Sequence, residues 1–149
     1  MRVLALAMIP ISLAACSATV KPNGGVAVRG MHVETEWKAN LVGTGPAAGL
    51  TGDAHAVTDG GKSEVTLNLA HGTAGRAYPW HVHSGACGSG GPVVGPAAAY
   101  PHAAIGRDGK STASAHLNFP LRRDASYYVN IHASSSQMGN IVACAPLTR

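Results

Sequence analysis

Several short stretches of the chain alternate apolar and polar residues, and the clearest of them covers residues 63–69. In an extended strand, Val65, Leu67 and Leu69 would share one face, because successive side chains point to opposite faces. The other stretches in which we expect strands are residues 31–42, 50–58, 80–83, 111–119, 126–133 and 141–145. The pattern therefore predicts a protein made of short strands.

Glycine and proline separate these stretches, in segments such as DGGK at 59–62 and GRDGK at 106–110. Turns of this kind join antiparallel strands, and no segment after the N-terminus shows a convincing helical period. A chain of 149 residues is long enough for one domain with a modest core. We therefore expect an all-β fold of about eight antiparallel strands, arranged as a sandwich or a barrel.

The N-terminal residues MRVLALAMIPISLAAC have the composition of an export signal. One arginine precedes an apolar run that is too short to span a bilayer as a helix, and small residues and a cysteine end it. The ending Leu-Ala-Ala-Cys resembles the bacterial lipobox, which implies cleavage before Cys16 and a lipid on its thiol. An ordinary signal peptide that ends near a cysteine is the alternative.

These features predict three parts of the chain: a signal peptide at 1–15, a flexible tether at 16–30 and one domain at 31–149. A lipid on Cys16 would anchor the protein to a membrane surface. The expected location is the bacterial cell envelope, facing the periplasm. Ser17 after the cysteine is compatible with sorting to the outer membrane.

The formal net charge of +4 comes from scattered basic residues, of which the densest run is the pair Arg122 and Arg123. Together with an aromatic content of 5%, this distribution argues against a nucleic-acid-binding surface. The acidic residues total 7 and form no cluster, and no Ser-His-Asp set is recognisable, so hydrolytic catalysis has little support. A mildly positive surface would instead attract small anions.

Two histidines, His81 and His83, lie two residues apart in the segment WHVHSGACG. On a strand they point to the same face, so one rigid segment could present two imidazoles to one ion. His132 ends another predicted strand, and a third imidazole joins the pair if that strand is a neighbour. Neutral imidazole suits copper and zinc. A pair of solvated polar residues is the alternative.

The chain contains 3 cysteines. If Cys16 carries lipid, Cys87 and Cys144 remain as a pair. Export would place them in an oxidising compartment, where such a pair usually forms a disulfide. On the chain-entropy model, closing this long loop would stabilise the fold by roughly 4 kcal/mol.

The segments WHVHSGAC and GPVVGP, followed by YYVNIHASSSQMGNIVACAPL, resemble the copper/zinc superoxide dismutase superfamily over about residues 50–147. The resemblance implies an eight-stranded Greek-key β-barrel that binds copper. The three matched histidines would be copper ligands, and the two matched cysteines would form a disulfide. The matched residues, in chain order, are His81, His83, Gly85, Cys87, His132, Gly139 and Cys144.

The sequence departs from this family at the positions that would hold zinc. Val93 stands where the family has a histidine that bridges copper and zinc, and the loop at 88–104 offers only His102. Zinc is therefore not expected, although His102 is a candidate for a further copper ligand. The family's anion-guiding arginine is also replaced, within residues 140–142. The resemblance thus extends to the related dismutase-like domains often called CHRD-type.

Two hypotheses of function follow from these residues. The first is an exported, lipid-anchored copper-binding protein of the superoxide dismutase type, which disproportionates the superoxide anion at a zinc-free three-histidine copper site. The second is a non-catalytic copper-binding or structural envelope module on the same fold. No catalytic residue is assigned, because the bridging histidine and the guiding arginine of the family are missing.

Overall fold

The computed structural model describes residues 26–29 and 32–149, and the predicted signal peptide and Cys16 lie outside the described residues. Antiparallel strands dominate it, with two short 3-10 helices, so the expected all-β class is confirmed. No helix in the described part of the chain is long and apolar enough to cross a membrane. The elements are β1 (Val26–Arg29), β2 (His32–Val42), η1 (Gly45–Ala47), β3 (Thr51–Asp59), β4 (Lys62–Ala70), β5 (Ala77–Tyr78), β6 (Trp80–Ser84), η2 (Ala97–Ala99), β7 (Ala103–Ala104), β8 (Ser111–Leu117), β9 (Tyr127–His132) and β10 (Ile141–Leu147).

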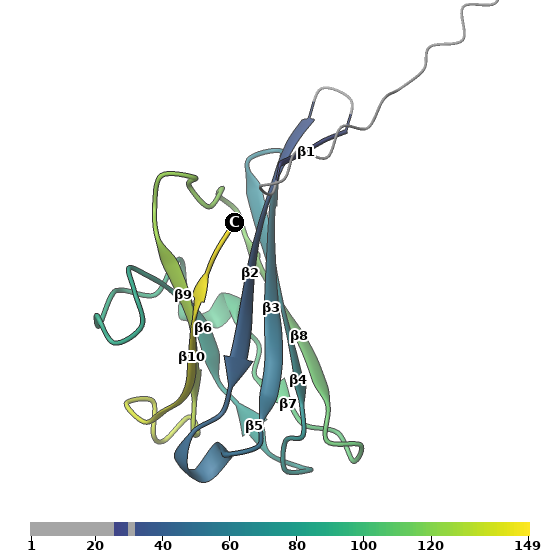
Figure 1. Ribbon diagram of the computed structural model, residues 1–149, viewed down its shortest axis with the longest axis vertical. Coiled ribbons are helices and arrows are strands. Elements are labelled where there is room, and N and C mark those ends of the chain that lie inside the picture. The colour runs from purple at the N-terminus through teal and green to yellow at the C-terminus, as the bar shows by residue number, and fades with distance from the viewer. Residues whose placement is uncertain (1–25, 30–31) are drawn as a thin grey trace, which may run out of the picture.

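Two larger sheets face each other across the core (Figure 1). One has five strands in the order β1-β2-β3-β4-β8, and the other has three strands in the order β10-β9-β6. Strands β5 and β7 form a separate two-residue ladder. The chain builds β1 to β4 as consecutive hairpins, crosses to β6, returns with β8 beside β4, and crosses again to β9 and β10.

The core lies between the inner faces of these sheets. Along β4, the predicted alternation is confirmed, because Val65, Leu67 and Leu69 are buried. Val129 and Ile131 of β9 face them from the other sheet and are fully buried. Burial of a side chain of this size contributes about 1.5–3 kcal/mol, so each residue of these facing rows adds to the stability of the fold.

The sheets do not close into a barrel, so the barrel form of the expected fold is wrong. On one side, Lys38 of β2 exchanges two backbone hydrogen bonds with Thr148, with N–O distances of 2.6 and 2.8 Å. On the other side, no ladder joins β6 to β8 within the described residues. The Gly-, Pro- and Ala-rich segment between these strands lacks a strand pattern of useful length, and its one named strand is the two-residue β7, which pairs with β5.

Three short strands lie in segments where the sequence predicts none. β1 falls inside the segment 16–30, where a flexible tether was predicted, and pairs with the start of β2. β5 and β7 fall in segments where loops were predicted. Each of these strands is only two to four residues long, and such short pieces leave little alternation for a sequence pattern to show.

Candidate metal centre

The pairing of β6 with β9 brings three histidines together. In this antiparallel register, His81 lies opposite Asn130 and His83 lies opposite Tyr128. His132 follows Asn130 on the same face of β9, and its backbone N–H donates to Pro79 just before β6. One ring nitrogen from each of the three histidines lies within 4.8 Å of the others. The predicted convergence of the three imidazoles is therefore confirmed.

Backbone carbonyls set which nitrogen of two of the rings carries the proton. His83 Nδ1 lies 2.8 Å from the Gly91 carbonyl oxygen, and His132 Nδ1 bonds the Met138 carbonyl oxygen. A carbonyl oxygen only accepts hydrogen bonds, so Nδ1 of each neutral ring carries the hydrogen. Nε2 of both rings is therefore left with a free lone pair, as a metal ligand requires.

The free nitrogens lie inside the cluster. His83 Nε2 is buried and has no hydrogen-bond partner in the described part of the protein. His132 Nε2 lies 3.1 Å from His81 Nδ1, which in this state donates its hydrogen to it. A buried polar atom without a partner is costly. A cation held by His81 Nδ1, His83 Nε2 and His132 Nε2 would satisfy all three atoms, with the proton of His81 displaced from Nδ1.

Burial favours the neutral form of the His81 and His132 imidazoles. Burial, followed in order of importance by the nearby His132, His83 and His102, lowers the pKa of His81 to about 4. Burial also lowers the pKa of His132, although the hydrogen bond to the Met138 carbonyl opposes that shift. Because a metal binds only the unprotonated nitrogen, protons compete weakly with a metal at this site near neutral pH.

Two tyrosines hold the rings in place. The Tyr128 ring stacks on His83 with centroids 5.1 Å apart and planes at 19°. Its hydroxyl oxygen accepts a hydrogen bond of 3.1 Å from the Gly91 N–H. Tyr100 packs edge-on against His81, with centroids 5.4 Å apart. Neither tyrosine is assigned to the site from the sequence, although Tyr128 shares a face of its strand with His132, which is a usable signal.

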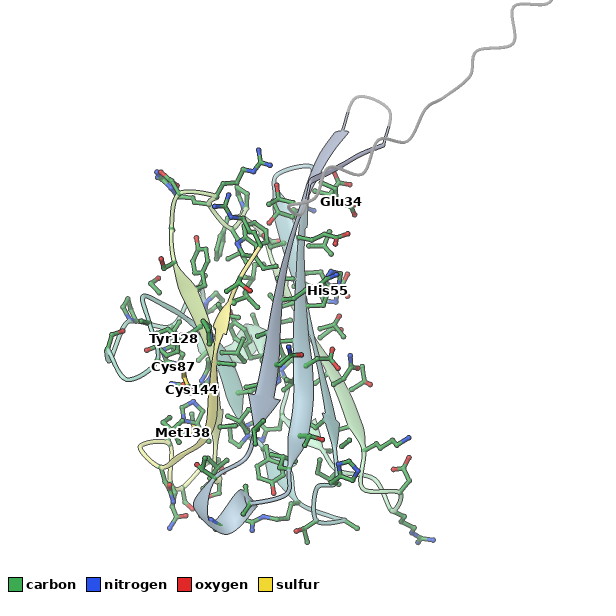
Figure 2. The ribbon with its side chains drawn as sticks, viewed as in Figure 1. Glu34, His55, Cys87, Tyr128, Met138 and Cys144 are labelled. Carbon is green, nitrogen blue, oxygen red and sulfur yellow. A yellow bond between two sulfur atoms is a disulfide. The ribbon has the colours of Figure 1, made fainter. Side chains whose placement is uncertain are left out.

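The predicted disulfide between Cys87 and Cys144 is confirmed, with Cα atoms 6.0 Å apart. It ties the loop after β6 to β10, on the same side of the three-stranded sheet as Tyr128 and Met138 (Figure 2). The tied loop includes Gly91, whose carbonyl orients His83. The disulfide therefore supports the histidine cluster as well as the fold.

A cavity of about 660 Å³ opens beside the cluster. None of the described residues that line it is an aspartate, glutamate, lysine or arginine. Asn130, 8% exposed, contributes a buried Oδ1 that has no hydrogen-bond partner in the described chain. The lining residues are Val42, Thr44, His83, Gly88, Gly90, Gly91, Tyr128, Asn130, His132, Met138, Ile141, Ala143 and Cys144.

Other candidate residues lie outside the cluster. His102 is exposed and is not among the three convergent histidines, although it lies close enough to His81 to affect its pKa. Val93, where the resemblance noted above would place a bridging histidine, packs against the core. A cation that the sequence did not indicate lies nearby, since Arg76 donates to the carbonyl oxygen of Ala133 over 3.4 Å.

No family model matches the sequence, and no curated protein gives a significant match. The function is therefore inferred from the residues and contacts of the histidine cluster and its cavity.

Proposed function

We propose that this protein binds one copper ion through His81 Nδ1, His83 Nε2 and His132 Nε2. The observation that carries the proposal is the convergence of three imidazoles, two of which have their free nitrogen set by a backbone carbonyl. The buried and unpartnered Nε2 of His83 fits this role, because a ligand to it would remove an unsatisfied atom.

The donor set supports copper as the metal. The three groups are imidazoles, without a carboxylate or thiolate, and imidazole suits both copper and zinc. For a given set of ligands, divalent copper binds more tightly than divalent zinc. The resemblance of these segments to the superoxide dismutase superfamily also favours copper, because the three matched histidines are that family's copper ligands.

We propose the Greek-key arrangement of that superfamily as the finer description of the fold. The return of β8 beside β4, and of β9 beside β6, after connections that cross between the sheets, supports it.

We further propose that the protein acts in the bacterial envelope, held by a lipid on Cys16. The export signal predicted from the sequence supports this location, and a disulfide is typical of exported proteins.

Disproportionation of superoxide is a second candidate function. Copper, when bound, would supply the one-electron oxidation and reduction by which two superoxide ions and two protons become dioxygen and hydrogen peroxide. The cavity supports this candidate, since His83 and His132 line it and a small anion has room to approach. The uncharged lining weighs against fast turnover, because it offers no cation to attract and position the anion.

Copper binding is tested on the purified protein by equilibrium dialysis against a copper chelator of known affinity. We expect one copper per chain, with affinity reduced by more than about 100-fold in His83→Ala and His132→Ala, because each loses a direct ligand. His116→Ala is the matched control, since His116 is exposed on the other sheet. Unchanged binding in His132→Ala, or no binding by the unmodified protein, would refute the proposal.

Superoxide decay in the presence of the copper-loaded protein then tests the second candidate. Acceleration that disappears in His132→Ala would support disproportionation. Copper bound without acceleration would leave a non-catalytic copper-binding module, and the absence of bound copper would favour a structural envelope module.

A further inference from the structure

Met138 lies in the loop between β9 and β10, where its neighbours are serine, glutamine, glycine and asparagine. Met138 lines the same cavity as His83 and His132. Figure 2 shows Met138 on the same side of the molecule as Cys144. It is 36% exposed and does not belong to the core, so packing does not account for a methionine at this position.

The backbone of this loop is held next to the histidine cluster. The Met138 carbonyl accepts the hydrogen of His132 Nδ1. Backbone hydrogen bonds close the loop itself, from Ala133 N–H to Asn140 over 2.9 Å and from Gln137 N–H to Ser134 over 3.0 Å. The backbone of Met138 is therefore positioned by a candidate metal ligand, while its side chain keeps three rotatable bonds with which to reach an ion.

The surroundings of the cavity favour a cation of low charge. Val42, Ile141 and Ala143 provide apolar wall, and no lining residue in the described chain carries a formal charge. Neutral imidazole and thioether ligands do not offset the charge of a bound metal ion. Burying that charge in apolar surroundings costs more free energy for a divalent than for a monovalent ion. Thioether sulfur is also a soft ligand that selects Cu(I).

We propose that the Met138 thioether is a fourth ligand that makes this site favour Cu(I) over Cu(II). The inference rests on the proposed copper binding and specifies its chemistry: the bound form is the cuprous ion, held by three histidines and one methionine. It assigns to the loop after β9 a role in choosing the oxidation state, in addition to its role in orienting His132.

The test measures the affinities for Cu(I) and Cu(II) separately, by competition with bicinchoninate under anaerobic, reducing conditions and with glycine in air. We expect Met138→Leu, which keeps the size and apolarity but removes the sulfur, to lower Cu(I) affinity by about tenfold. Its Cu(II) affinity should change by less than about twofold. Ser135→Ala is the control, because it changes an exposed side chain of the same loop that does not line the cavity, and it should leave the Cu(I) affinity within about twofold of the unmodified value.

X-ray absorption at the copper edge provides an independent readout. The Cu(I)-loaded protein should show one sulfur neighbour, which Met138→Leu should lose. Equal Cu(I) affinities of the unmodified protein and Met138→Leu, together with nitrogen neighbours only, would overturn the role of Met138 and leave histidine binding intact. If the unmodified protein binds neither form of copper, both the inference and the proposed function fail.

Discussion

His83 is held by Gly91 through both the backbone and a neighbouring ring. The His83 Nδ1–H donates to the Gly91 carbonyl oxygen over 2.8 Å. The Gly91 N–H donates to the hydroxyl oxygen of Tyr128, whose ring stacks on His83. One loop residue therefore fixes both the proton position of a candidate ligand and the ring that packs against it.

Gly91→Ala should weaken copper binding by roughly 10–100-fold, the effect typical of losing a partner that orients a metal ligand. A Cβ at this position would clash with the carbonyl oxygen of Ser84, so the loop must move and the His83 hydrogen bond is lost. Gly139→Ala is the matched control, because a Cβ there meets no atom within 4 Å. A competition titration with a copper chelator measures both, and equal affinities would contradict the role of Gly91.

Tyr128→Phe should lower the free energy of unfolding by about 1–3 kcal/mol, because it leaves the Gly91 N–H without its acceptor while keeping the ring stacked on His83. Tyr128→Leu removes the stacked ring as well and should be more destabilising. Urea unfolding followed by circular dichroism measures the difference. If both variants are as stable as the unmodified protein, the tyrosine does not support the site.

Replacing Cys87 and Cys144 together by serine should lower the free energy of unfolding by about 4 kcal/mol, since the disulfide joins residues 57 positions apart. Copper affinity should fall as well, because the freed loop contains Gly91. Unfolding with and without a reductant measures the first effect in the unmodified protein. Detection of two thiols at these positions before reduction would contradict the disulfide.

The metal-free protein should lose stability as the pH falls from 6.5 towards 4. The pKa of His81 is about 4 in the folded protein and 6.5 as its ordinary value. Between these values the unfolded chain binds a proton that the folded protein does not, so the contribution is complete above pH 6.5 and is lost on acidification. The slope from this one group is at most about 1.4 kcal/mol per pH unit.

Chemical unfolding of the metal-free protein at several pH values between 4 and 7 measures this slope. His81→Gln removes the titrating group and should make the free energy of unfolding less dependent on pH in this range. A variant with the same pH dependence as the unmodified protein would show that His81 is not the group responsible.

Much of the fold could be predicted from local patterns. The inward positions of β4 and of β8 were readable because the period of two along a strand is a property of neighbouring residues. The closed barrel was a wrong prediction, because closure depends on whether the edges of β6 and β8 pair. The segment between these strands shows no sequence pattern that predicts whether they pair.

The ligand residues were predictable from the sequence and their proton positions were not. His81 and His83 share a face because of their spacing, whereas His132 joins them only through the pairing of β6 with β9, across 51 residues. The tautomers depend on the carbonyls of Gly91 and Met138. Every residue has a carbonyl, so no side-chain pattern marks the two that matter.

The sequence by itself determined the strand-forming segments, the pair of cysteines and the three histidines, because each depends on residue type and short-range spacing. Only the tertiary structure decided that the sheets stay open, that an uncharged cavity lies beside the histidines, and that Met138 lines it. These features arise where distant segments meet, and strand register, loop path and burial together set which atoms come into contact there.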